Sequence, residues 1–230
     1  MRRSLLLLVL SSLLLAVHAR AGAAQATTGR LIKGHDERGK YQVAWVRLTD
    51  GTAAPAVRRA VNADLEREAR DHICDPEPDP ARRRYLDAWY EMEVAYRSPR
   101  LLGIRTFMEL WCGGGSPSGG TGFLLYDLRT GKRIEVENEM SDPRGFRRFV
   151  ARRALAAALS DPGECADLYT LDELARTGYV YILNPRSLTA FQDYPRVVMA
   201  CGYDTEIPYA DILRFLKPGS PLRTLAEPRP

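Results

Sequence analysis

Four cysteines carry the most definite chemistry in this 230-residue chain: Cys74, Cys112, Cys165 and Cys201. Structural zinc sites usually need close pairs such as C-x-x-C, and these four cysteines lie far apart. An even number of cysteines in an exported chain indicates two disulfides, with buried free thiols as the alternative. A strand that leaves near residue 85 and returns by Cys112 would bring that cysteine beside Cys74. We therefore expect Cys74–Cys112 and, by elimination, Cys165–Cys201, one of the three possible connectivities.

Neither histidine nor serine occurs in a recognisable catalytic pattern. Outside the first 23 residues only His35 and His72 remain, and neither lies in an H-E-x-x-H or H-x-x-H pattern. Ser116 and Ser118 lie in a glycine-rich stretch over 113–122 that has no G-x-S-x-G, no S-x-x-K and no phosphate-binding G-K-[ST]. We read this stretch as a flexible strand connection, with a ligand-contacting loop as the alternative. No catalytic, cofactor-binding or metal-binding residue is assigned, and no cofactor is expected.

Carboxylates offer a weaker route to catalysis. Glu135, Glu137 and Glu139 alternate along an expected strand, and three more acids follow late in the chain at Asp204, Glu206 and Asp211. Two acids across a cleft could hydrolyse a glycoside. Alternating acids on a strand more often form a solvated face of a sheet.

Aromatic side chains could stack on sugar rings or anchor a protein partner. Trp45, Trp89, Trp111, Tyr90 and Tyr96 all fall in strand patterns. Core packing is therefore expected for most of them.

The first 23 residues have the layout of a secretory signal peptide: a basic start, an apolar run over 5–15 and a small-residue exit ending at Ala23. The alternative is a membrane anchor, but a span needs about 20 apolar residues, and His18 and Arg20 end this run early. We expect cleavage after Ala23, with Ala24 as the first mature residue, and cleavage after Ala19 or Ala24 as the alternatives. The mature protein is then periplasmic or secreted, with no membrane span.

Composition is that of a folded protein, with 45% hydrophobic and 27% charged residues. The formal net charge is +4, and three of these charges belong to Arg2, Arg3 and Arg20, which leaves +1 after cleavage. A charge this small, with acids and bases interspersed, gives no indication of nucleic-acid binding.

Hydrophobic periodicity predicts the elements that would position these side chains. Residues 90, 92, 94 and 96 alternate on one face of a strand that forms a hairpin with 104–110. Pro55 begins a helix whose apolar positions recur every fourth residue to Ile73, and Asp142 caps a second helix. Further strands are expected over 40–48, 123–128, 133–136, 179–183 and 196–201, and further helices after Thr170 and over 209–216.

Strands that neighbour one another more often than they alternate with helices indicate an α+β fold, with a mostly antiparallel sheet and helices packed on one face. We divide the chain into the signal peptide, a linker over 24–40, one domain over 41–217 and a proline-rich, unstructured tail over 218–230.

Three segments resemble a known domain family: 89–96 (WYEMEVAY), 125–132 (LYDLRTGK) and 202–209 (GYDTEIPY). The family is domain of unknown function 3298, which lies at the C-terminus of the anti-sigma factor RsiV and beside peptidoglycan deacetylase domains. The resemblance extends over about residues 41–216. It implies an α+β domain outside the membrane, and in the anti-sigma factor such a domain is a receptor for lysozyme.

Two functions follow as hypotheses. The leading one is a non-catalytic envelope domain that binds a lysozyme-like protein or a cell-wall glycan of the peptidoglycan type. The alternative is an enzyme that acts on cell-wall polysaccharide through scattered carboxylates. The absence of a recognisable catalytic pattern favours binding.

Overall fold

The computed structural model describes residues 26–28, 32–36, 39–49, 51–74, 79, 81, 87–112, 117–160, 170–192 and 204–226. Along the chain its elements are β1 (Ala26–Thr28), β2 (Ile32–Asp36), β3 (Gly39–Val43), β4 (Val46–Leu48), α1 (Pro55–Asp71), β5 (Asp87–Arg97), β6 (Leu101–Trp111), β7 (Ser118–Asp127), β8 (Lys132–Arg133), η1 (Val136–Glu139), α3 (Pro143–Ser160), α4 (Leu171–Arg176), β9 (Tyr179–Leu183), β10 (Ser187–Gln192), β11 (Thr205–Pro208), α5 (Tyr209–Ile212), η4 (Leu213–Phe215) and η5 (Pro221–Leu225), where η marks a 3-10 helix.

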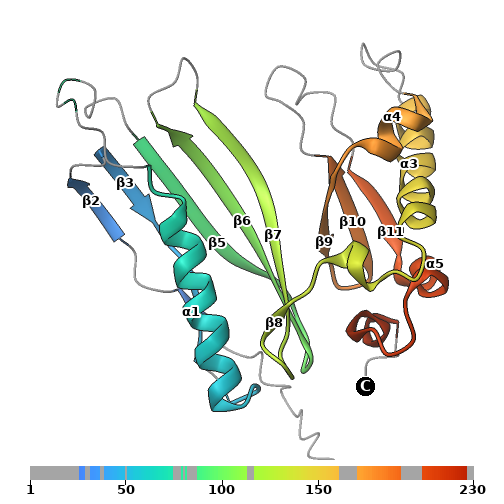
Figure 1. The fold of residues 1–230 in the computed structure, drawn as a ribbon, viewed down its shortest axis with the longest axis horizontal. Coiled ribbons are helices and arrows are strands. Elements are labelled where there is room, and N and C mark those ends of the chain that lie inside the picture. Colours follow the sequence, from blue (N-terminus) through green and yellow to red (C-terminus); the bar gives the residue numbers. More distant parts are fainter. Residues whose placement is uncertain are drawn as a thin grey trace, which may run out of the picture.

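Most of the strands belong to two separate sheets (Figure 1). The larger sheet has six strands in the order β2-β3-β5-β6-β7-β8, and the smaller has three in the order β11-β10-β9. Among the described pairs only β3 and β5 run parallel, and β4 and α1 make the crossover that a parallel pair needs. The expected α+β fold with mostly antiparallel strands is confirmed. The division into two sheets was not predicted.

Helix α1 covers one face of the larger sheet. Its side chains Val61, Leu65 and Ala69, four residues apart, are fully buried. They form one core with residues of the sheet that include Tyr90, Met92, Leu102, Ile104 and Tyr126. The predicted apolar face of this helix is confirmed, and so is its start at Pro55.

A β-bulge in β5 changes which face of the larger sheet Tyr96 occupies. The register between β5 and β6 shifts between Val94 and Tyr96, so that Tyr96 lies opposite Gly103. Tyr90 belongs to the core under α1, whereas Tyr96 belongs to the core on the other side of the sheet. The prediction that 90 and 96 share a face was therefore wrong, because an extra residue in one strand reverses the alternation.

Helix α3 covers the smaller sheet and is capped as expected. The backbone N–H of Gly145 donates to Asp142 Oδ1 at 2.9 Å. Phe146 and Val150 of α3 are fully buried in one core with Leu183 and Ile207 of the smaller sheet. In Figure 1 the helix lies on the outer side of this sheet, so the other side of the sheet is turned toward β7.

Ordered structure extends beyond the expected domain at both ends. Strands β1 and β2, which pair with β4 and β3, lie in the segment over 24–40 that was expected to be a linker. In the expected tail, η5 buries Leu222 and Leu225 in the core that includes α3. Pro221 begins the helical turn of η5 instead of ending ordered structure, because proline is favoured at the first position of a helix. The apolar side chains that follow it are therefore buried.

The glycine-rich stretch is partly a strand. Residues from Ser118 onward belong to β7, which pairs with β6 from Leu110↔Ser118 to Leu101↔Asp127. The expected loop over 113–122 is therefore shorter on its C-terminal side, and residues 113–116 lie outside the described part of the chain. Glycine lowers the preference for a strand, but a long partner strand supplies hydrogen bonds along the whole length of this one.

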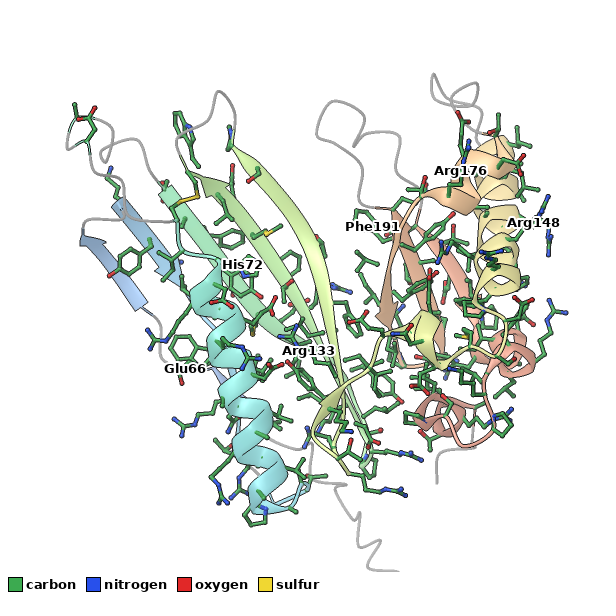
Figure 2. All side chains as sticks on the ribbon, viewed as in Figure 1. Glu66, His72, Arg133, Arg148, Arg176 and Phe191 are labelled. Carbon is green, nitrogen blue, oxygen red and sulfur yellow. A yellow bond between two sulfur atoms is a disulfide. The ribbon has the colours of Figure 1, made fainter. Side chains whose placement is uncertain are left out.

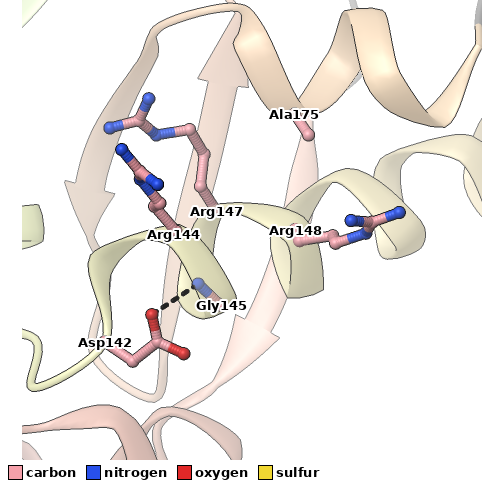
Figure 3. Close-up of a pocket in the computed structure, with 6 residues that line it drawn as sticks. All are labelled: Asp142, Arg144, Gly145, Arg147, Arg148 and Ala175. Carbon is pink, nitrogen blue, oxygen red and sulfur yellow. Dashed lines mark hydrogen bonds between the residues drawn. The ribbon is translucent and has the colours of Figure 1, made fainter.

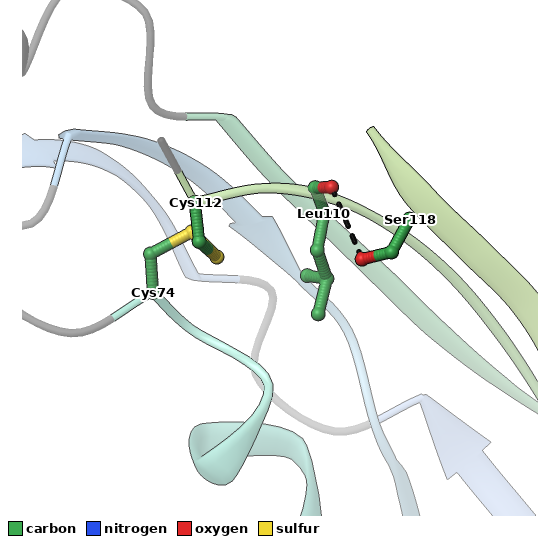
Figure 4. Close-up of a disulfide and its surroundings, with 4 residues drawn as sticks. All are labelled: Cys74, Leu110, Cys112 and Ser118. Atoms are coloured by element: carbon green, nitrogen blue, oxygen red, sulfur yellow. Dashed lines mark hydrogen bonds between the residues drawn. A yellow bond between two sulfur atoms is a disulfide. The ribbon is translucent and has the colours of Figure 1, made fainter. Parts of the chain in front are cut away.

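A disulfide joins the end of α1 to the end of β6 (Figure 4). Cys74 and Cys112 are bonded, with a Cα–Cα distance of 5.3 Å. The first expected disulfide is confirmed. The second, Cys165–Cys201, lies outside the described residues, as do the expected strand over 196–201 and the cleavage site at Ala23 and Ala24.

Candidate functional site

His72, a candidate from its residue type, is held by contacts within the fold. Its ring stacks on that of Tyr90 with 4.3 Å between centroids, and its Nδ1 lies 2.7 Å from the backbone oxygen of Glu68. His35 lies in β2. In the part of the chain that the structure describes, no three His, Cys, Asp or Glu side chains are grouped in a way that could hold a metal ion.

The acids between 135 and 139 do not alternate along a strand. The chain turns after the two-residue β8, and Glu137 and Glu139 lie in the 3-10 helix η1. Glu137 accepts hydrogen bonds from the Tyr181 hydroxyl at 2.9 Å and from two nitrogens of Arg147. The expectation of a solvated strand face was wrong, because Glu137 joins η1 to α3 and the smaller sheet.

The late acids are also dispersed. Glu206 accepts a hydrogen bond from Ser187 Oγ at 2.5 Å, and Asp211 pairs with Arg153. Asp204 lies apart from both, in a groove described below.

The face of the larger sheet turned away from α1 gathers exposed aromatic and acidic side chains. Successive strand residues point to opposite faces, so the neighbours of the residues under α1 occupy this open face. It consists of Trp89, Glu91 and Glu93 on β5, Arg105, Phe107, Glu109 and Trp111 on β6, and Thr121 and Phe123 on β7. Trp89 and Trp111 are 37% and 40% exposed, whereas Trp45 is buried.

The pairing of β5 with β6 places side chains of the open face opposite one another. Trp89 lies opposite Glu109, Glu91 opposite Phe107, and Glu93 opposite Arg105. Glu93 and Arg105 form an ion pair at 3.2 Å. Two of these three pairs therefore place an aromatic side chain opposite an acidic one.

A groove lies between the open face and the smaller sheet. Its volume is about 360 Å³. The larger sheet contributes Arg105, Phe107 and Thr121, and the smaller sheet and its flanks contribute Ile182, Asn184, Thr189, Phe191 and Asp204. In Figure 2, Phe191 lies on the side of β10 that is turned toward β7. This inter-sheet groove combines aromatic rings with amide, hydroxyl and charged groups, a composition typical of binding sites.

A polar network on the opposite face fixes the sheet to α1. Arg133 Nε donates to Asp64 Oδ2 and Arg133 also donates to Glu68 Oε2, both at 2.5 Å. The Tyr126 hydroxyl donates to the same Asp64 oxygen at 2.8 Å. Burial raises the pKa of Tyr126 to about 12, and burial also raises the pKa of Tyr90. These groups link α1 to the sheet, and Tyr126 is buried between them, so we assign the network to the support of the open face.

A second pocket, at the start of α3, is less suited to a ligand (Figure 3). Arg144, Arg147 and Arg148 lie around it. Arg147 pairs with Glu137, Arg148 lies 3.8 Å from Asp172, and the Asp142 side chain occupies the helix N-terminus. Carboxylates of the protein already offset much of this positive charge.

Sequence reasoning found part of the open face. Trp89 and Trp111 were candidates from their residue type, although core packing was expected for most of the aromatic residues. That expectation is confirmed for Trp45, Tyr90 and Tyr96, which are buried. The groove was missed because β10 and β11 were not predicted, and β10 supplies Thr189 and Phe191. The alternation of Leu188, Ala190 and Gln192 with Thr189 and Phe191 was the available signal.

Comparisons with known proteins identify the fold. The chain is similar to the crystal structure of a DUF3298 family protein from Pseudomonas aeruginosa PAO1, with 17% identity, a TM-score of 0.52, and coverage of 86% of this chain and 94% of that one. It is also similar to a DUF3298 family member from Bacteroides fragilis, with 13% identity, a TM-score of 0.61, and coverage of 88% and 98%. No protein-family model and no curated protein matches the sequence.

Proposed function

We propose, for a chain that has the fold of DUF3298 family proteins, that it is a non-catalytic binding domain that works outside the cytoplasm. Its ligand is a protein with a basic surface, of the lysozyme type, held on the open face and in the inter-sheet groove. The observation that carries the proposal is the exposure of Trp89 and Trp111 among acidic residues on one face of one sheet.

Exposed tryptophans in this arrangement favour a protein partner. Tryptophan is among the residues most enriched at binding hot spots, because its ring buries a large area and retains one hydrogen-bond donor. Trp89 and Trp111 lie on neighbouring strands and point from the same face, so one partner surface can cover both. The flanking Phe107 continues this surface into the groove.

The charge of the open face favours a basic ligand. Glu91, Glu93 and Glu109 are exposed there, and Asp87 is exposed next to them, opposite Trp111. Arg105 is ion-paired with Glu93. Opposite charges speed encounter and select among partners. Peptidoglycan carries carboxylates on its peptide stems, which these acids would repel. Charge thus favours the basic protein over the cell-wall glycan.

Catalysis is less well supported than binding. Glu137 and Asp211, two of the acids considered for a hydrolytic pair, are engaged with Arg147 and Arg153. Both carboxylates therefore hold elements of the fold together, and they lie in separate places.

A location outside the cytoplasm is supported by two observations. The Cys74–Cys112 disulfide is typical of proteins in oxidising compartments. The first 23 residues have the pattern of a signal peptide, and cleavage after Ala23 stays a prediction. Among the described residues, no helix is both long enough and apolar enough to cross a membrane.

The test is calorimetry of the mature protein, residues 24–230, with lysozyme and with lysozyme whose lysines have been succinylated. We expect binding of the basic form only. Trp89→Ala and Trp111→Ala should each weaken it by roughly 30-fold, the equivalent of about 2 kcal/mol. The matched control is Val94→Ala, since Val94 is also 37% exposed and lies on β5, but on the opposite face of the sheet.

Peptidoglycan fragments are assayed in parallel for release of reducing sugar or acetate. Equal binding of native and succinylated lysozyme, or of neither, would argue against the basic ligand. Release of product that a single Asp or Glu substitution abolishes would replace binding with the enzymatic alternative.

A further inference from the structure

The outer edge of β7 is paired over only a small part of its length. On its inner side β7 pairs with β6 from Ser118 to Asp127. On its outer side it pairs with β8 only at Tyr126 and Asp127. Within the ranges that the structure describes, no strand pairs with this edge between Ser118 and Leu124.

The backbone groups on this edge can be identified from one hydrogen bond. The oxygen of Leu125 accepts from the N–H of Ile134 at 2.7 Å, so the backbone groups of Leu125 point outward. N–H and C=O groups of alternate residues in a strand point to the same side. Gly119, Thr121 and Phe123 therefore direct their N–H and C=O groups away from β6.

The edge lacks the features that usually prevent strand addition. Natural edge strands are commonly blocked by lysine, proline, bulges or short length. Residues 118–126 (SGGTGFLLY) contain no proline and no charged residue, and the ladder with β6 is regular over them. Glycine in a strand is also typical of a place where another backbone approaches closely.

The inter-sheet groove lies beside this edge. Thr121 lines the groove from β7, and Ile182, Thr189 and Phe191 face it from the smaller sheet. Neighbouring strands lie about 4.8 Å apart, so a strand added at this edge would lie next to Thr121 and the groove that it lines.

We infer that the β7 edge between Ser118 and Leu124 binds an extended, cationic segment of a partner protein by strand addition. Main-chain hydrogen bonds to Gly119, Thr121 and Phe123 supply affinity, and alternate side chains of the segment enter the groove. Glu109 lies opposite Gly119, and Asp204 lines the groove, so acidic groups are near the segment. Arg105 also lines the groove, and it is paired with Glu93. The inference rests on the proposed basic protein ligand and adds how part of it is recognised.

The probe is the blocked nonapeptide KVTVKVTVK, titrated into ¹⁵N-labelled mature protein. We expect saturable binding with a dissociation constant below about 1 mM, a weak affinity that suits a few hydrogen bonds to one strand. Amide exchange should slow at Gly119, Thr121 and Phe123. The same peptide N-methylated at alternate residues keeps its side chains and charges but loses donors, and it should bind at least about tenfold more weakly.

Substitutions on the protein give a second test. Thr121→Pro removes an outward N–H without removing a bond to β6 and should weaken the peptide about tenfold. Thr121→Val keeps the N–H and should bind as the unchanged protein does. Should Thr121→Pro fail to fold, the N-methylated peptide still decides, because it leaves the protein unaltered.

Three results would overturn the inference: no binding of the peptide, equal binding of its N-methylated form, or unchanged exchange at the three amides. A dimer in sedimentation that Thr121→Pro dissociates would assign the edge to a second copy of the chain and equally overturn it. If Trp89→Ala loses lysozyme binding and Thr121→Pro retains it, strand addition at the β7 edge is rejected and the proposed function is kept. Peptide binding without lysozyme binding would reject the proposed ligand alone.

Discussion

The hydroxyl of Tyr126 on β7 donates a hydrogen bond to Asp64 Oδ2 on α1 at 2.8 Å, across 62 residues of sequence. Arg133 donates to the same oxygen. Helix and sheet are thus joined by directional contacts as well as by the apolar core between them. The open face, on the other side of the sheet, depends on this attachment for its shape.

Tyr126→Phe should lower the free energy of unfolding by about 1 kcal/mol, because one hydrogen bond is lost while Asp64 keeps Arg133 as a partner. Urea denaturation of a double-mutant cycle with Asp64→Asn measures the coupling. We expect at least about 0.5 kcal/mol between the two positions. Additive effects of the two substitutions would show that the hydrogen bond contributes nothing.

Stability should fall above pH 10. Burial raises the pKa of Tyr126 and of Tyr179 to about 12, while a tyrosine in the unfolded chain titrates near 10. Below pH 10 both states hold the proton and this contribution is fully present. Between pH 10 and 12 the unfolded state has released protons that the folded state retains, so stability is lost, by on the order of 2 to 3 kcal/mol for Tyr126.

Denaturation at several pH values, with tyrosinate absorbance as the second signal, checks this dependence. Tyr126→Phe should reduce the slope of stability against pH in the alkaline range. Stability that stays constant from pH 9 to pH 12 would contradict the expected shifts.

Gly122→Ala should destabilise the protein by about 1 to 3 kcal/mol, the usual range for overpacking. Gly122 lies opposite Thr106, and a Cβ at position 122 would be 2.6 Å from Thr106 Oγ1. Thr106→Ala, made alone and together with Gly122→Ala, should restore in the double variant much of the stability that Gly122→Ala loses. Gly51→Ala is the matched control, since a Cβ there meets nothing within 4 Å. Thermal unfolding of the four variants makes the comparison, and an equal effect at 51 and 122 would remove the steric explanation.

Removal of the disulfide in Cys74→Ser/Cys112→Ser should cost about 4 kcal/mol in the chain-entropy model, because the bond closes a loop of 38 residues. Guanidinium denaturation of both proteins, with and without reductant, measures the difference. The double variant should not respond to reductant through this pair. If reductant destabilises both proteins by a similar amount, the stabilisation comes from the other two cysteines. Peptide mapping can test their predicted bond.

Leu222→Ala should cost about 2 to 5 kcal/mol, the range for a fully buried leucine. Leu159→Ala is the control, since Leu159 is 60% exposed, and it should change stability by less than about 0.5 kcal/mol. Chemical denaturation compares the two. A small effect at Leu222 would mean that residues beyond 217 contribute little to the fold, as the sequence pattern suggested.

The sequence alone determined the local elements. Four-residue periodicity identified α1, a helix was expected after Thr170 where α4 begins, and alternation identified the β5–β6 hairpin with its disulfide. These signals act between residues that are neighbours in the chain or within one hairpin, so the side chains themselves specify them.

Tertiary structure decided which face each side chain occupies. The bulge after Val94 placed Tyr96 on the other face from Tyr90, and contacts with Arg147 and Tyr181 hold Glu137 in a half-buried position. It also placed β10 against the open face, which created the groove from Phe107 and Phe191. Each of these outcomes depends on contacts between segments far apart in the chain. A sequence pattern therefore defines the residues that alternate, whereas packing between the two sheets decides which of them a ligand can reach.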